Sequence, residues 1–296
     1  MAAGTWDFGD TEVGRIGYGA MRLTGNGMRG NSDGPPVDRG AAVRLLHQAF
    51  DGGVNHVDTA AFYFSPLRSA NELVGRALAS WRGEVAVATK VGPSRDAAGE
   101  WQGMARPDRL RGQVEENLRQ LGRDHLDLVY LRCVGADTPS VAEHLGVLAA
   151  LREEGLIRHL GLSAVRPEHV VEALGVAPLV AVQNAYGLDE RRADANGLID
   201  LCGARGLAFV PFFAISGTRR EAAATAETDA RVRAVAAAHD ATPAQIRLAW
   251  TLHRAPHVLA IPGTRDPAHL AQNIAAASIR LTPAELQLLN SPPTEA

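Results

Sequence analysis

Four side chains able to handle a proton or an anion stand at or just after the ends of short apolar runs. Asp58 closes VNHVD and Tyr63 follows five residues later, while Lys90 closes AVATK and Arg132 closes LDLVYLR. If these runs are neighbouring parallel strands, about 5 Å apart, the side chains converge at one end of the sheet. An ammonium held by a carboxylate favours the ionised form of a nearby phenol, which makes the phenol a usable general acid. Such a group could protonate the oxygen of a carbonyl during its reduction.

Lys90 is also unusual in the composition of the chain. The 30 basic residues comprise 29 arginines and this one lysine. An ammonium is compact and can lose its proton, whereas a guanidinium is a planar fork that stays protonated. The bias suggests a position where arginine cannot replace lysine, with chance as the alternative.

Apolar runs alternate with helical patterns along the chain. We expect eight strands, at 15–23, 54–60, 84–91, 125–132, 157–164, 178–185, 207–214 and 258–264. Among the helices between them, one ends at Gly122 and the last begins with Asp266 as N-cap. Strict alternation of this kind predicts an α/β fold with a parallel sheet covered by helices. Eight units favour a (β/α)8 TIM barrel formed by residues 1–296 as a single domain, with a doubly wound open sheet as the alternative.

Two segments lie outside the alternation. The segment TWDFGDTEV, with Gly9 and Asp10 at its centre, predicts an N-terminal β-hairpin that could plug the barrel floor. The segment 92–107 is longer than a typical loop after a strand and carries Trp101, which makes that residue a candidate wall of the substrate pocket.

Composition excludes several classes of protein. A net charge of −3 without a long basic run argues against nucleic acid or an anionic membrane as partner. We expect a cytoplasmic protein, because no signal peptide or membrane-spanning stretch stands out. Cys133 and Cys202 form no C-x-x-C pair and are expected to be small core residues. No metal-ligand spacing is evident, and the oligomeric state is left open.

The motifs VDTAAFY, VATKV, LDLVYLR, GLS, VQNAY and IPGTRDPAHLAQN, in this order, resemble those of the aldo-keto reductases. The resemblance runs from about Gly14 to about residue 290. It implies a (β/α)8 barrel that reduces a small aldehyde or ketone with NADPH, with Asp58, Tyr63 and Lys90 as catalytic residues and Tyr63 as proton donor. No G-x-G-x-x-G loop follows a predicted strand, which disfavours a Rossmann domain.

The resemblance also implies a seat for NADPH/NADP+. Gln183 and Ser163 would contact the nicotinamide amide, and Phe212 would stack on the ring where the family usually has tyrosine. Arg265 would pair with the 2′-phosphate that distinguishes NADP from NAD. The remaining positions assigned to the cofactor are Ala20, Met21, Gly217, Gly263, Thr264, Gln272 and Asn273.

Two positions depart from the family pattern. Ala164 stands where the family commonly has asparagine, and Arg132 stands where most members have a histidine that orients the substrate. Arg132 could pair with Asp127 or Asp137, but Asp127 lies at an odd offset on the opposite face of the strand. We therefore expect Arg132 to face the barrel mouth and to favour a substrate with an anionic or phenolate group.

Other interpretations remain at this level. Lys90 could be the nucleophile of a Schiff-base lyase or aldolase. The missing histidine also allows a barrel that binds a nicotinamide nucleotide but has lost catalysis. His56, on the same strand face as Asp58, is expected to be a hydrogen-bonded core residue.

Overall fold

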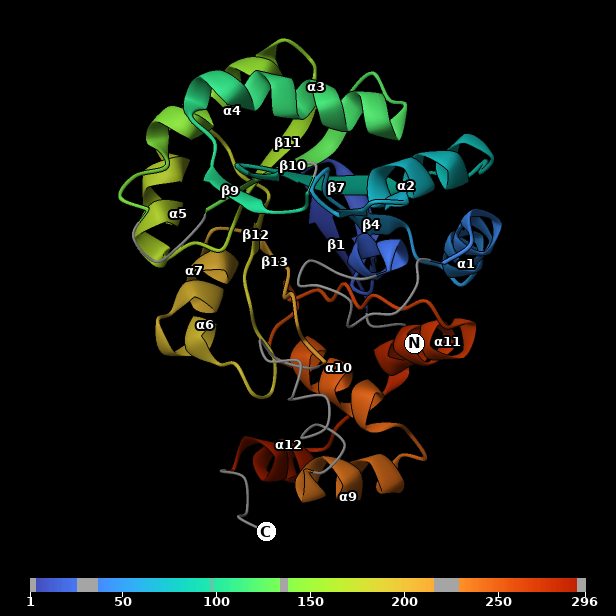
Figure 1. Ribbon diagram of the computed structural model, residues 1–296. Coiled ribbons are helices and arrows are strands. Elements are labelled where there is room, and N and C mark those ends of the chain that lie inside the picture. Colours follow the sequence, from blue (N-terminus) through green and yellow to red (C-terminus); the bar gives the residue numbers. More distant parts are fainter. Residues whose placement is uncertain (1–3, 26–36, 97, 134–137, 216–228, 292–296) are drawn as a thin grey trace.

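Seven parallel strands curl into the central sheet of the protein (Figure 1). The computed structural model describes residues 4–25, 37–96, 98–133, 138–215 and 229–291. The hydrogen-bonded order is β13-β12-β11-β10-β7-β4-β3, and the strands are β3 (Tyr18–Gly19), β4 (His56–Asp58), β7 (Ala86–Val91), β10 (Leu126–Arg132), β11 (Ile157–Ser163), β12 (Ala181–Gln183) and β13 (Ala208–Phe209).

The segment around Val258 and Ala260 closes this sheet into a ring. Val258 forms a parallel bridge with Phe209, and Ala260 forms one with Ile16, just before β3. The structure is therefore a (β/α)8 barrel, as predicted, and the doubly wound alternative is excluded. The eighth position contributes isolated bridges instead of a continuous strand, because Pro262 has no N–H to extend the ladder.

The first strand differs from the expected span of 15–23. After β3 the chain turns into the 3-10 helix η1 (Ala20–Thr24). Gly17 donates its N–H to Ala260 O and Gly19 donates to Pro262 O, so the pairing with the closing segment ends at Gly19. Ala20 and Met21 thus lie on a helical turn above the strand and not within it.

The helices cover the outside of the barrel (Figure 1). Helix α11 (Pro267–Ala275) begins with the predicted N-cap, since the Asp266 carboxylate accepts hydrogen bonds from the N–H groups of Ala268 and His269. Another ends at Gly122, whose φ of 67° is left-handed. The helices are α1 (Arg39–Asp51), α2 (Ala70–Ala79), α3 (Leu110–Leu121), α4 (Ala142–Glu153), α5 (Pro167–Leu174), α6 (Arg192–Ala195), α7 (Leu198–Ala204), α9 (Ala230–Ala238), α10 (Pro243–His253), α11 (Pro267–Ala275) and α12 (Pro283–Asn290), with the 3-10 turns η3 (Pro107–Arg109) and η4 (Ala276–Ser278).

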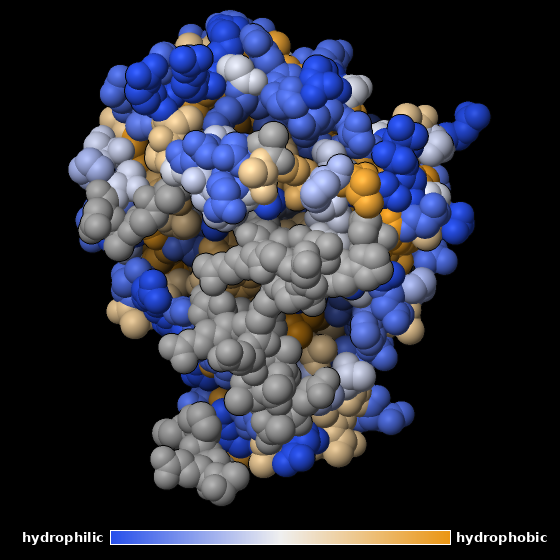
Figure 2. Space-filling model, viewed as in Figure 1, coloured by the Kyte–Doolittle hydropathy of each residue, from blue (hydrophilic) through white to orange (hydrophobic). Residues whose placement is uncertain are grey.

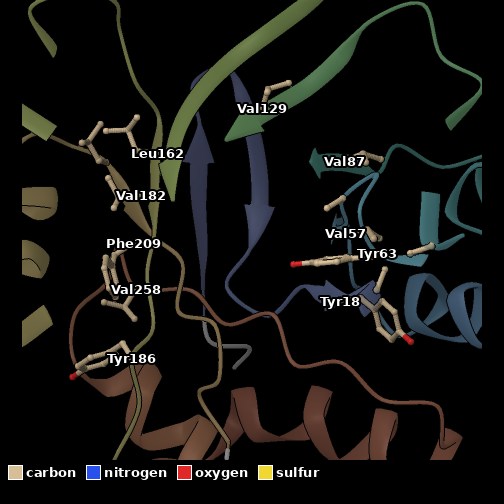
Figure 3. Close-up of a cluster of buried hydrophobic side chains, with 14 of the residues drawn as sticks. Tyr18, Val57, Tyr63, Val87, Val129, Leu162, Val182, Tyr186, Phe209 and Val258 are labelled. Carbon is tan, nitrogen blue, oxygen red and sulfur yellow. The ribbon is translucent and has the colours of Figure 1, made fainter. Parts of the chain in front are cut away.

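Alternate residues of each strand face opposite sides of the sheet. The apolar set that packs toward the helices is buried and surrounds the barrel in Figure 3, where it includes Val57, Val87, Val129, Leu162, Val182, Phe209 and Val258. The next residue along a strand faces the interior of the barrel. Asp58 follows Val57 in this way, and Lys90 lies three residues after Val87. The apolar packing outside the sheet thereby directs polar side chains inward.

An antiparallel hairpin precedes the barrel, as predicted. Its strands are β1 (Thr5–Phe8) and β2 (Thr11–Gly14), and Phe8 and Val13 are buried against the inner face of the sheet. Asp10, in the turn, accepts hydrogen bonds from Arg158 (2.8 Å) and pairs with His159 (2.7 Å) near the start of β11. These contacts hold the hairpin at the end of the barrel where the parallel strands begin, opposite the ends that carry Asp58 and Lys90.

The surface shown in Figure 2 is mostly hydrophilic over α3 and α4, with scattered apolar side chains. Within the described residues, no helix is long and apolar enough to cross a membrane. Cys133 and Cys202 are both buried and unpaired, as expected of small core residues.

Candidate active site

A buried ion pair lies at the strand ends that face the barrel mouth. The Lys90 ammonium is 2.6 Å from Asp58 Oδ1 and also donates to the backbone oxygen of Thr59 at 2.9 Å. The side chains of Lys90 and Asp58 are 0% and 5% exposed. Burying two charges is costly unless they are paired and hydrogen-bonded, and this geometry meets both conditions. The pair is therefore held rigidly.

Tyr63 covers the ammonium of this pair. The Lys90 nitrogen lies 4.8 Å from the centre of the Tyr63 ring. The loop after β4 holds the phenol in place, because Tyr63 N–H donates to Ala60 O and Tyr63 O accepts from Ala70 N–H. Phe62 packs edge-on against the ring at 5.1 Å. Figure 3 shows the hydroxyl directed toward the interior of the ring of strands. The structure thus brings Asp58, Tyr63 and Lys90 together as the sequence predicted.

The second oxygen of Asp58 has a partner on a distant strand. Gln183 Nε2 donates to Asp58 Oδ2 at 2.6 Å, although β7, β10 and β11 separate β4 from β12 in the sheet. This bond therefore crosses the barrel interior. No sequence pattern indicated it.

Arg132 faces the same mouth. It is paired in register with Ser163, and its Nη1 donates to Ser163 Oγ at 3.3 Å. The guanidinium carbon lies 5.2 Å from the centre of the Phe212 ring. Asp127 instead binds Arg123 at 2.9 Å and the Val87 N–H at 2.8 Å, which excludes it as the partner of Arg132.

Asp137, the other acid considered for Arg132, lies outside the described residues. Within the described part of the chain, no carboxylate forms a salt bridge with Arg132. Its observed contacts are the Ser163 hydroxyl and the aromatic face of Phe212. Both contacts orient the guanidinium without neutralising it.

Three of the expected nicotinamide contacts lie on or just after the adjacent strands β11, β12 and β13. Ser163 and Gln183 are register partners on β11 and β12 and are fully or almost fully buried. Phe212 follows β13 and is partly exposed. Ala164, which directly follows Ser163, adopts a φ of 58°, a left-handed conformation that asparagine tolerates better than alanine. The departure at Ala164 thus costs backbone strain as well as an amide group.

The expected phosphate segment packs closely on the first strand. A Cβ at Gly263 would lie 2.4 Å from Gly19 O, so this glycine is required by backbone packing, a reason that the sequence did not suggest. Tyr18 donates its hydroxyl proton to Thr264 O at 2.5 Å. These contacts place Ala20, which follows Gly19, near the start of the segment 263–265.

The start of α11 is only partly open to an anion. The Asp266 carboxylate already accepts from the N–H groups of Ala268 and His269, so phosphate binding would depend on Arg265, which is partly exposed. Asn273 is 6% exposed, and its carboxamide has no hydrogen bond to another described residue. Its amide atoms are not among the fully buried side-chain atoms that lack a partner, so they remain open to solvent or to a ligand.

Two other cofactor positions carry less structural information. Gln272, beside Asn273 on α11, is partly exposed. Gly217 lies outside the described residues.

Trp101 lies on a hairpin within the long loop after β7. The hairpin consists of β8 (Pro93–Arg95) and β9 (Trp101–Met104). Trp101 is 42% exposed and packs 5.5 Å from Phe62, the residue that contacts Tyr63. Arg95 supports this wall by donating to the backbone oxygen of Phe64 at 2.9 Å. Phe62 and Arg95 were not predicted from the sequence, although Phe62 directly precedes the proton-donor candidate.

A shorter hairpin follows Tyr63. Its strands are β5 (Phe64–Ser65) and β6 (Arg68–Ser69), and it leads directly into α2. Arg95 lies 4.8 Å from the centre of the Phe64 ring, so the two hairpins are in contact beside the site.

The prediction that His56 is hydrogen-bonded was wrong. His56 is 1% exposed, but neither ring nitrogen has a partner among the described residues, and burial lowers its pKa to about 4. The ring occupies space left by Gly17, where a Cβ would lie 2.1 Å from the imidazole. The Tyr130 hydroxyl is similarly buried, and burial together with the charge of Asp58 holds its pKa well above the usual value. These two rings fill the interior of the barrel.

The fold and these strand-end residues define a barrel oxidoreductase. The model of the aldo/keto reductase family matches residues 15–291. Pyridoxine 4-dehydrogenase of Escherichia coli (strain K12) is 39% identical in an alignment over 295 residues that covers 98% of each chain. The chain therefore belongs to the aldo/keto reductase family.

Solved structures agree with this assignment. The glycerol dehydrogenase of Gluconobacter oxydans has a TM-score of 0.82 at 26% identity, covering 98% of this chain and 95% of that one. An aldo/keto reductase of Klebsiella pneumoniae in complex with NADP and acetate has a TM-score of 0.78 at 28% identity, covering 97% and 94%. The predictions of an NADP-dependent oxidoreductase and of NADP(H) as cofactor are confirmed at the level of the family.

Proposed function

We propose that the protein reduces an aldehyde or ketone to an alcohol, with Tyr63 as the proton donor. The observation that carries this proposal is the position of the Lys90 ammonium, 2.6 Å from Asp58 and 4.8 Å from the centre of the Tyr63 ring. When bound, NADPH supplies the hydride that reduces the carbonyl carbon. Tyr63 donates its proton to the carbonyl oxygen, so that no free alkoxide accumulates, and regains a proton from solvent. Arg132 donates hydrogen bonds and adds electrostatic support.

The same ion pair argues against a Schiff-base mechanism. A nucleophilic lysine must be a neutral amine, and enzymes favour that form by an apolar pocket or a neighbouring cation. Lys90 instead donates to the Asp58 carboxylate and to the Thr59 backbone oxygen. Both partners stabilise the ammonium, so Lys90 supports the phenol and is not the nucleophile.

The cofactor would lie across the barrel mouth from the ends of β11 and β12 to α11. Gln183 and Ser163 hold the nicotinamide amide, Phe212 stacks on its ring, and Arg265 pairs with the 2′-phosphate. Asn273, on α11, would contact the adenosine end, because its carboxamide makes no hydrogen bond to another described residue. The other residues that we assign to the cofactor are Ala20, Met21, Gly217, Gly263, Thr264 and Gln272.

The substrate class follows from Arg132 and the aromatic wall. A guanidinium stays protonated, so Arg132 cannot share the proton-donor role and instead favours an anionic or phenolate oxygen. Trp101, which is 42% exposed and packs on the buried Phe62, offers an aromatic face for an aromatic ring. The relative at 39% identity is a pyridoxine 4-dehydrogenase. These points support an aromatic aldehyde with a neighbouring phenolate, such as pyridoxal, as substrate.

Turnover of matched aldehydes tests both parts of the proposal. NADPH absorbance is followed with pyridoxal, with salicylaldehyde and with benzaldehyde, which lacks the phenolate. Tyr63→Phe should abolish turnover of all three while NADPH binding is unchanged, because the phenol acts on the carbonyl. Absence of any turnover by the wild-type protein would favour a barrel that binds the nucleotide without catalysis.

Arg132→Ala separates the substrate assignment from the mechanism. It should lower kcat/KM for the phenolate aldehydes, with a rise of about 2–4 kcal/mol in the corresponding activation free energy, the usual effect of losing one preorganised donor. The effect on benzaldehyde should be smaller. The pH profile of kcat/KM should show no histidine step at about pH 6.5, since Arg132 stands where a histidine would titrate. An Arg132→Ala enzyme active on all three aldehydes would show that the residue is structural.

A further inference from the structure

The hydrogen bond between Asp58 and Gln183 connects the two halves of the site. Asp58 belongs to the proton-donor side through Lys90, and Gln183 belongs to the cofactor side at the end of β12. The two side chains meet at 2.6 Å across the barrel, and both residues are buried. A bond this short between buried groups restricts the orientation of both.

The orientation of the Gln183 amide follows from chemistry alone. Asp58 pairs with the Lys90 ammonium and is a carboxylate, which can only accept hydrogen bonds. The NH2 end of the Gln183 amide must therefore face Asp58, and its oxygen Oε1 must face away.

Ser163 supplies a complementary group on the adjacent strand. It is the register partner of Gln183, and its Oγ accepts from Arg132 Nη1, so its own O–H is left to donate. An amide oxygen and a hydroxyl proton then lie side by side at the barrel mouth. An acceptor beside a donor matches the NH2 and C=O ends of a carboxamide.

Building on the proposed function, we propose that Asp58 is a positioning residue for the cofactor as well as for Lys90. By fixing the Gln183 amide, it makes Oε1 the acceptor for the NH2 of the nicotinamide carboxamide. The proton-donor pair and the cofactor contact thereby share one carboxylate. A change at Asp58 alters cofactor recognition as well as proton transfer.

A cofactor analogue without the NH2 group tests this assignment by binding alone. The probe is the reduced 3-acetylpyridine analogue of NADPH, in which a methyl ketone replaces the carboxamide, and affinities are measured by fluorescence titration. Wild-type protein should bind the analogue roughly ten times more weakly than NADPH, because Oε1 is left without a donor. Tyr63→Phe, which leaves Asp58 and Gln183 intact, should keep this ratio.

Asp58→Asn should remove the preference. The asparagine oxygen can still accept from Lys90, which directs its NH2 group toward Gln183 and requires the Gln183 oxygen in return. The Gln183 amide then turns over, its NH2 faces the cofactor, and the ratio should fall to about one. Gln183→Leu, which has no polar group, should give the same loss of preference. The fragment 2′-phospho-ADP-ribose, which lacks nicotinamide, should bind all forms equally and reports whether each variant is folded.

The outcomes separate this inference from the proposed function. Failure of the wild-type protein to bind NADPH would overturn both. An unchanged ratio in Asp58→Asn, with fragment binding intact, would overturn the positioning role of Asp58 alone. If Asp58→Asn does not bind the fragment, Gln183→Leu decides, and an unchanged ratio in that variant overturns the inference.

Discussion

Acidification should destabilise the folded protein through His56. Burial lowers the pKa of this imidazole from 6.5 to about 4. Between these values the unfolded chain takes up a proton that the folded protein does not, so stability is complete above the upper value and falls with the pH. The linkage relation gives a loss of about 2 kcal/mol between pH 7 and pH 5, and about 3 kcal/mol over the whole window.

Urea unfolding at pH 7 and pH 5 measures this loss. His56→Leu cannot take up a proton, and neither imidazole nitrogen has a described partner to lose, so the variant should keep about 2 kcal/mol more of its stability on acidification. Burial also lowers the pKa of His257, and that histidine affects both proteins alike. The difference between wild type and variant is therefore the quantity to compare.

An exposed histidine provides the matched control. His269 lies on the outer surface of α11, and His269→Gln should leave the pH dependence of unfolding as in the wild type. Equal losses of stability in the wild type and in His56→Leu would refute the argument. They would mean that His56 binds a proton in the folded protein, and hence that its ring nitrogens have a partner or access to water.

Substitutions at three further positions have definite expected outcomes. Lys90→Arg should reduce kcat by about a hundredfold or more, because a planar guanidinium does not fit the fully buried position of the ammonium. The affinity for NADPH, measured by titration, should be unchanged. A fully active variant would show that the occurrence of lysine at this position is accidental. Arg265→Ala should weaken NADPH binding by about 1.5–3 kcal/mol and leave NADH unaffected, and equal wild-type affinities for both cofactors would contradict the role of Arg265. Ala164→Gly and Ala164→Asn should each raise the free energy of unfolding by about 0.5–1 kcal/mol, because both residues tolerate the left-handed φ better than alanine. Only the asparagine variant should also tighten NADPH binding. A loss of stability in both variants would argue against strain at this position.

Sequence periodicity was sufficient to predict the elements that position the candidate catalytic residues. The apolar face of each strand packs on helices, so a polar residue that closes a run must face inward, as Asp58, Lys90 and Arg132 do. The same argument excluded Asp127 as the partner of Arg132. Local patterns also predicted the hairpin before the barrel and the N-cap at Asp266.

Contacts across the barrel could not be predicted in this way. The bond between Asp58 and Gln183 depends on the closure of the ring and on the side chains that fill its interior, which no local pattern encodes. The same limit explains the error at His56, because periodicity places the ring inside but does not show whether a partner reaches its nitrogens. The early end of the first strand reflects its pairing with the segment that carries Pro262, far away in the sequence.

The burial of the one lysine determines how the protein reacts with aldehydes in general. Primary amines condense with aldehydes to imines, so exposed lysines on a protein capture reactive aldehydes and are modified by them. Here the Lys90 side chain is 0% exposed, and the chain contains no other lysine. Guanidinium groups do not form imines with simple aldehydes. Apart from the amino terminus, the surface therefore offers an aldehyde no primary amine, and prolonged exposure to an aldehyde should leave few imine adducts on the protein.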